Sequence, residues 1–165
     1  MEHHDRVDHI QQQWRRERPA IDVSPQAVIG RLHRLADHLR EELIAGYRQY
    51  GLGEGEFDVL ATLRRAGDPY QLAPGELAAH TMVTTGAISK RLDRLEAAGL
   101  VWRGASDRDG RGRIVGLTDA GRTLIDTAFE AHMRNEHRLL APLTPAQRTQ
   151  LADLLKQWLH ALGRS

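Results

Sequence analysis

The chain has 165 residues, a formal net charge of +1 and no cysteine. This length suits one domain, or one domain with dimerisation arms. The lack of cysteine excludes disulfides, thiolate metal ligands and cysteine nucleophiles, and no run of about 18 apolar residues is present that could span a membrane. Residues 1–19 are polar and lack the apolar stretch of a secretory signal, so we expect a cytoplasmic protein.

Helical periodicity predicts two amphipathic helices in the first part of the chain. In residues 5–17 the apolar side chains recur three and four positions apart, which fits one helical face, and they are Val7, Ile10 and Trp14. Ser24-Pro25 predicts the start of the second helix, because serine caps helices and proline suits their first turn. Its apolar stripe continues to about Tyr50. A helix of that length outruns the core of a small domain, so we expect its ends to pack elsewhere.

Three shorter helices are predicted next. The first opens at Gly55-Glu56, the second begins at Pro74, and the third covers residues 84–98. The third helix should turn its apolar side chains inward, and these are Ile88, Leu92 and Leu95. Gly99 supplies the glycine that commonly follows a helix end.

A short β-hairpin and two more helices complete the chain. Residues 100–103 and 113–117 predict two strands around a loop rich in turn residues and charge. One helix begins at Thr118, and Thr144-Pro145 begins the last one. The stripe of that terminal helix is unusually wide, and it consists of Leu151, Leu154, Leu155, Trp158, Leu159 and Leu162. The expected fold class is mainly α with a small β-hairpin.

The pattern from Pro74 to Leu117 reads helix, turn, helix and basic hairpin, which is typical of a winged helix-turn-helix. In that arrangement the start of the second helix faces base edges in the DNA major groove. Small and hydroxyl-bearing side chains can approach bases there, and free amides at the helix start can bind a phosphate. Basic side chains four residues apart on one face can neutralise backbone charge. The candidate DNA contacts on this helix are Thr84, Thr85, Gly86, Ser89, Lys90 and Arg94.

The hairpin supplies a second group of candidate DNA contacts, which are Arg108, Arg111 and Arg113. An arginine at a hairpin tip can enter the minor groove, where narrow A·T stretches concentrate negative potential. The alternative is a solvated loop whose charges bind nothing. The hairpin follows directly after a helix-turn-helix pattern, which favours contact between its arginines and DNA.

These stretches resemble the MarR family of bacterial regulators. The resemblance rests on ELAAHTMVTTGAISKRLDRLEAAGLV, on the hairpin segment DRDGRGRIVGLTDAG and on the closing amphipathic helix, and it covers residues 24–163. It implies a winged-helix dimer with intertwined N- and C-terminal helices, and a pseudo-palindromic operator with half-sites about one helical turn apart. The family often has two arginines after the hairpin aspartate. Gly110 replaces the first of them here, so Arg111 is the residue expected to enter the groove.

The resemblance also implies which part of the chain has which role. Residues 1–50 would form the lid of a ligand pocket and part of the dimer interface, residues 51–118 the DNA-binding lobe, and residues 119–165 further dimerisation helices. The expected function is a sequence-specific DNA-binding transcriptional regulator, a repressor that binds its operator as a homodimer. We expect no enzyme, because glycine-rich phosphate loops, nucleophile elbows and metalloprotease motifs are missing from the sequence.

The added N-terminal helix with its tryptophan resembles the urate-responsive, PecS-like branch of this family. The residues that match the pocket of that branch are Trp14, Asp58, Arg65 and Arg91. A flat anionic purine can stack on an indole and pair with the planar fork of an arginine. Asp58 could hold Arg91 until an incoming anion disturbs the pair, which would couple the pocket to DNA binding. The implied effector is a small anionic aromatic molecule, with urate or a related purine as the candidate, and no cofactor is expected beyond it.

Several alternatives stay open at this point. Trp14 could only seal its helix against the body, Asp58 could form a structural ion pair with Arg65 or Arg91, and the effector could be a different ligand. A protein-interaction module that keeps the winged fold without DNA binding is the alternative from another class. The nine histidines predict no metal site, because pairs five residues apart point to different sides of a helix.

Overall fold

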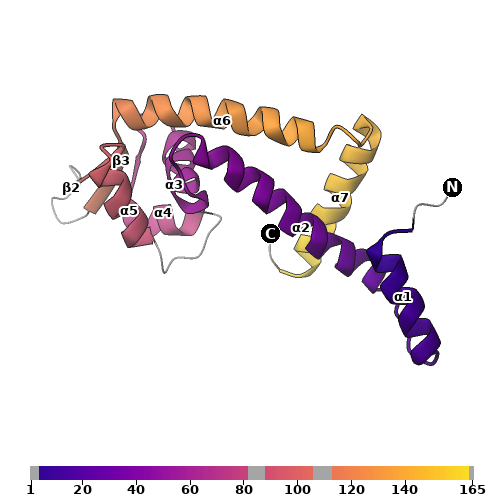
Figure 1. Ribbon diagram of the computed structural model, residues 1–165. Coiled ribbons are helices and arrows are strands. Elements are labelled where there is room, and N and C mark those ends of the chain that lie inside the picture. Colours follow the sequence, from indigo (N-terminus) through magenta and orange to yellow (C-terminus); the bar gives the residue numbers. More distant parts are fainter. Residues whose placement is uncertain (1–3, 82–87, 106–112, 164–165) are drawn as a thin grey trace. The chain divides into compact units, whose positions relative to one another are not determined.

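A computed structural model of the chain describes residues 4–81, 88–105 and 113–163. The chain is mainly helical with one small antiparallel sheet, so the expected fold class is confirmed (Figure 1). It divides into two compact units, Met1–Ile44 and Ala45–Ser165, each of which is taken by itself below. Within the described ranges, no helix is both long and apolar enough to cross a membrane.

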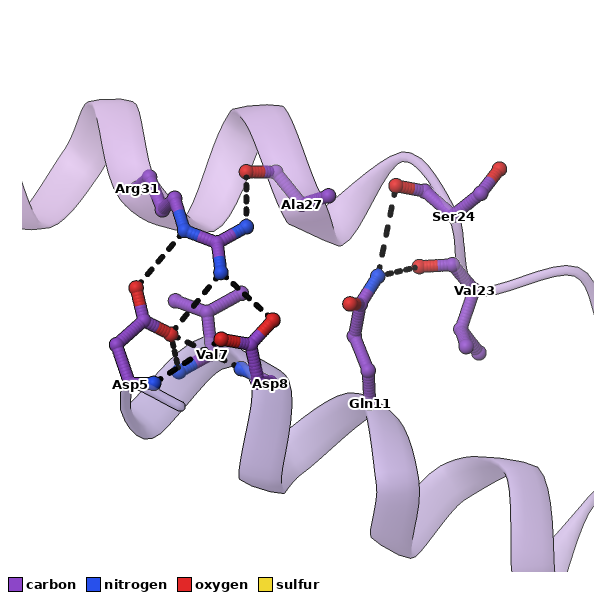
Figure 2. Close-up of polar contacts among 8 residues, drawn as sticks. All are labelled: Asp5, Val7, Asp8, Gln11, Val23, Ser24, Ala27 and Arg31. Atoms are coloured by element: carbon purple, nitrogen blue, oxygen red, sulfur yellow. Dashed lines mark hydrogen bonds and ion pairs between the residues drawn. The ribbon is translucent and has the colours of Figure 1, made fainter. Parts of the chain in front are cut away.

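The first unit contains α1 (Arg6–Glu17) and most of α2 (Gln26–Arg48), two helices that the periodicity predicts. α1 begins with a capping box, in which the carboxylates of Asp5 and Asp8 each accept a hydrogen bond from the backbone N–H of the other. Arg31 of α2 closes over this cap, donating to Asp5 at 2.8 Å and to Asp8 at 2.7 Å (Figure 2). The hydrogen bonds from the Asp8 N–H and from Arg31 lower the pKa of Asp5 to about 2. The cap is therefore ionised at neutral pH.

Two further contacts dock α1 on the start of α2. Val7 is buried against Gly30, where an added Cβ would lie 3.4 Å from the Val7 methyl carbons. The side-chain amide of Gln11 is buried and donates to the carbonyl oxygen of Val23 at 2.8 Å (Figure 2). Trp14 follows the helical spacing of Val7 but is 46% exposed. Gln11 takes the buried position one turn after Val7, because its amide finds a backbone partner there.

The second unit holds the helix-turn-helix and the sheet. Its elements are α3 (Glu54–Arg65), β1 (Gln71–Leu72), α4 (Pro74–His80), α5 (Ile88–Ala97), β2 (Val101–Ala105), β3 (Arg113–Leu117), α6 (Asp119–Leu139) and α7 (Pro145–Ala161). α3 packs against α4, α5 and α6, and these helices gather with the sheet around the start of α6 (Figure 1).

Aliphatic side chains form the core of this unit. The largest fully buried ones are Val59, Leu60, Leu63, Leu77, Val115 and Ile125. α5 adds the three inward side chains that its periodicity predicts, Ile88, Leu92 and Leu95, each 6% exposed or less. That prediction is confirmed, while residues 84–87 of the expected helix lie outside the described residues.

The sheet has three antiparallel strands in the order β1-β3-β2. The predicted hairpin is confirmed by the register of β2 and β3, in which Val101 pairs with Leu117 and Trp102 with Gly116. The indole of Trp102 lies over Gly116, where an added Cβ would come within 2.5 Å of the ring. The edge strand β1 is not predicted from the sequence, because a strand of two residues is too short to show periodicity.

The last two helices begin with the predicted caps. The Thr118 hydroxyl accepts from the N–H of Gly121 at 3.0 Å, and Thr144 forms a capping box with Gln147. α7 has no buried residue, although it carries the wide apolar stripe seen in the sequence. Its exposed side chains include Leu154 at 55% and Leu162 at 62%. Apolar surface on this scale is typical of an interaction site.

Candidate nucleic-acid interface

α5 presents the predicted DNA contacts on its polar face. Its apolar side chains point into the core, so the intervening polar ones face solvent. The exposed candidates are Ser89, Lys90 and Arg94. The other candidates of this helix lie outside the described residues, and they are Thr84, Thr85 and Gly86.

A carboxylate from a neighbouring helix holds Arg94. Its Nη1 lies 3.2 Å from Oε1 of Glu56 in the first turn of α3, while the arginine side chain stays 73% exposed. The other Glu56 oxygen accepts from the N–H of Gly53 at 2.6 Å and so completes the cap of α3. The Glu56 side chain is only 14% exposed, so the carboxylate end of this ion pair is largely buried while the guanidinium end faces solvent. The exposed end leaves Arg94 accessible to a DNA phosphate.

The hairpin presents one described candidate, Arg113. It lies at the start of β3, opposite Ala105, and is exposed. Arg108 and Arg111 lie outside the described residues. The base of the hairpin is anchored in the core, since Val101 is 2% exposed.

Arg103 in the middle of β2 is not among the DNA contacts that the sequence predicts. Its Nη2 lies 2.7 Å from Oδ1 of Asp93, and its Nε donates to Oε2 of Glu96 at 2.9 Å. The hydrogen bond from Arg103 lowers the pKa of Glu96, and the bonds to Glu96 and Asp93 raise the pKa of Arg103. The sequence offers one signal, namely two carboxylates one helical turn apart that precede a basic strand residue.

The residues expected to bind a ligand are divided between the two units. Trp14 belongs to the first unit, while Asp58, Arg65 and Arg91 belong to the second. Arg91 of α5 lies against Gly55 in the first turn of α3, so closely that an added Cβ would meet its guanidinium.

Arg65 lies at the opposite end of α3, where its Nη2 donates to the carbonyl oxygen of His80. Gly55 and Arg65 are ten positions apart on the helix, which is about 15 Å at the usual rise. The structure thus places Arg91 and the half-buried Asp58 along the first half of α3 and Arg65 at its end. The Arg91 guanidinium buries its Nη1 without a hydrogen-bond partner among the described residues.

A two-helix unit whose second helix exposes basic side chains, followed by an antiparallel hairpin, defines a winged-helix DNA-binding protein. The MarR family model matches residues 50–112. The HTH-type transcriptional regulator PecS of Dickeya dadantii is 41% identical over 149 residues, which cover 90% of each chain. The chain therefore belongs to the MarR family of transcriptional regulators.

Two further comparisons agree with this assignment. The HTH-type transcriptional repressor Rv2887 of Mycobacterium tuberculosis is 35% identical over 126 residues, 76% of this chain and 88% of its own. The crystal structure of a MarR variant from E. coli, complexed with operator DNA, superposes with a TM-score of 0.70 at 27% identity and covers 84% of this chain and 99% of its own. Both the winged fold and the expectation of a DNA-binding regulator, as opposed to an enzyme, are confirmed by these relatives.

Proposed function

We propose that this regulator is a repressor that binds a pseudo-palindromic operator as a homodimer and is released by a small anionic aromatic ligand. Residues 51–118 would contact DNA, and the helices before and after them would form the dimer. The observation that carries the DNA-binding part is the polar face of α5, where Lys90 and Arg94 are exposed beside Ser89. The exposed stripe of α7 supports the homodimer, because a second copy of this chain would cover it.

Replacing Lys90 by alanine should weaken binding to most DNA sequences alike. Each lost phosphate contact lowers the slope of log affinity against log salt by about 1. We expect this change in a gel-shift titration on the upstream region of the protein's own gene at several salt concentrations. Arg111→Ala should weaken binding as well, through the loss of the minor-groove contact.

Lys156→Ala provides the matched control, because this exposed lysine lies on α7 and not on the DNA-binding lobe. Its salt dependence should equal that of the parent. Parent-like binding by Lys90→Ala would contradict the assignment of α5 as the helix in the major groove, and parent-like binding by Arg111→Ala would contradict the wing contact.

For the effector we propose urate or a related purine, bound by Trp14, Asp58, Arg65 and Arg91. One observation supports an anion near Arg91. Its guanidinium has a buried nitrogen without a described partner, and such a nitrogen costs stability until an acceptor binds it. Trp14 supports an aromatic ligand, since its indole is nearly half exposed and can stack. Arg91 belongs to α5, so a ligand there would act directly on the DNA-binding helix.

Titrating urate into the operator-bound protein should release the DNA. The double variant Trp14→Phe with Arg65→Ala should still bind DNA but lose this release, because stacking and charge recognition both weaken. The measurement is fluorescence anisotropy of a labelled operator, with Lys156→Ala as the control for an exposed side chain outside the proposed site. The urate assignment is wrong if no purine alters DNA binding at millimolar levels, and release by another anionic aromatic would identify a different effector.

A further inference from the structure

In the DNA-binding lobe, Arg103 connects the sheet to α5 through two carboxylates. We propose that Arg103 is a positioning residue for DNA recognition, which sets the wing against the recognition helix α5 by bridging Asp93 and Glu96. It would act through these carboxylates and not through a contact of its own with DNA.

The geometry of the bridge is specific to a guanidinium. Asp93 and Glu96 lie three residues apart on α5 and so on one helical face. Arg103 reaches both of them, with Nη2 on Asp93 and Nε on Glu96. The planar fork of arginine can engage two carboxylates at fixed angles, whereas a lysine ammonium is a single point charge. One side chain of the wing therefore spans a full turn of the recognition helix.

The position of the bridge matters for both DNA-contacting parts. Ser89 and Lys90 lie in the turn of α5 before Asp93, and β2 directly precedes the segment whose sequence contains Arg108 and Arg111. The chain passes from α5 to β2 through Gly99, whose φ of +70° marks the bend between them. Arg103 comes shortly after this bend, and its side chain connects β2 to α5.

The two carboxylates are otherwise out of place on a surface that binds a polyanion. Their side chains are 61% and 40% exposed, and negative charge near DNA lowers affinity through repulsion of phosphates. This gives two explanations with opposite predictions. If Asp93 and Glu96 act only through their charge, removing them strengthens DNA binding. If they hold Arg103 and thereby the wing, removing them weakens binding to the operator.

The test uses the whole chain and a DNA duplex that the parent protein selects from a random library. Binding of the parent to this duplex tests the proposed function by itself, and the variants then test the role of Arg103. We expect Arg103→Ala to reduce affinity for this duplex about tenfold, within the range of couplings that pass through a contact network. Asp93→Ala with Glu96→Ala should reduce it similarly, although this variant carries two fewer negative charges. Its affinity for an unrelated duplex should be unchanged or higher, because non-specific binding follows charge.

A charge swap and a control complete the design. Arg103→Glu alone should bind the selected duplex poorly, and adding Glu96→Arg, which restores the parent net charge, should recover most of the affinity. Arg31→Ala is the matched control, because Arg31 also bridges two carboxylates on a neighbouring helix but lies in the first unit. It should bind the duplex like the parent. Tighter or unchanged binding by the Asp93→Ala/Glu96→Ala variant, or a failed recovery in the charge swap, would overturn the proposal.

Discussion

Gly121→Ala is expected to destabilise the second unit by about 3 kcal/mol, the upper end of the usual cost of overpacking. An added Cβ at this position would lie 1.9 Å from the carbonyl oxygen of Leu100 and 2.9 Å from its carbonyl carbon. These are backbone atoms, so no side-chain rotation relieves the overlap. Either the connection between α5 and β2 or the first turn of α6 has to move.

Neither segment can move without breaking other contacts. The Leu100 carbonyl accepts from the N–H of Thr118 at 3.1 Å, and the Thr118 hydroxyl donates to the carbonyl of Gly99 at 2.7 Å. The same hydroxyl caps α6 by accepting from Gly121. The strain therefore spreads over the α6 cap and the base of the wing together. This explains physically why the LTDAG stretch ends in glycine.

Thermal unfolding followed by circular dichroism checks the prediction, and we expect the midpoint to fall by about 10 °C. Gly75→Ala is the control, because this glycine is exposed in α4 and an added Cβ would meet nothing within 4 Å. Alanine favours helices over glycine by roughly 0.5–1 kcal/mol, so the control should be neutral or slightly stabilised. A Gly121→Ala protein that unfolds like the parent would show that the two backbone segments lie further apart.

Elements with strong periodicity could be predicted from the sequence, while contacts between distant residues could not. The spacing of Ile88, Leu92 and Leu95 placed the inward face of α5 correctly, because a helical stripe is a local property. Nothing local predicts that Arg103 turns back to Glu96, since this depends on how β2 packs against α5. Another distant contact explains why Gln11 is buried while Trp14 is exposed, since the Gln11 amide donates to a backbone carbonyl oxygen twelve residues away.

The candidate site was predictable in its chemistry and less so in its layout. Basic residues after an amphipathic helix identify a DNA-binding surface, and the exposed face of α5 carries them as expected. The ligand residues, by contrast, are implied by the resemblance alone. α3 keeps Arg65 at the end opposite Arg91, a separation that linear spacing on two different helices cannot reveal.

Two acidic substitutions on the exposed stripe of α7 should separate the proposed homodimer into monomers. Leu154 and Leu162 are both more than half exposed in the single chain, so replacing them leaves the fold of the protomer intact. Leu154→Glu with Leu162→Glu would place two charges in an interface that has to exclude water, and burying an unpaired charge is costly. We expect the mass from light scattering to halve.

Operator binding should fall with the loss of the dimer. In a symmetric complex the second half-site is bound at a high effective concentration, and this advantage is worth about a hundredfold or more in affinity. Thr149→Glu with His160→Glu is the matched control, because these exposed residues lie on the opposite side of α7 and introduce the same two acidic side chains. The control should remain dimeric and bind the operator like the parent. A parent that is monomeric in solution, or an acidic-stripe variant that stays dimeric, would show that something other than a second copy covers α7.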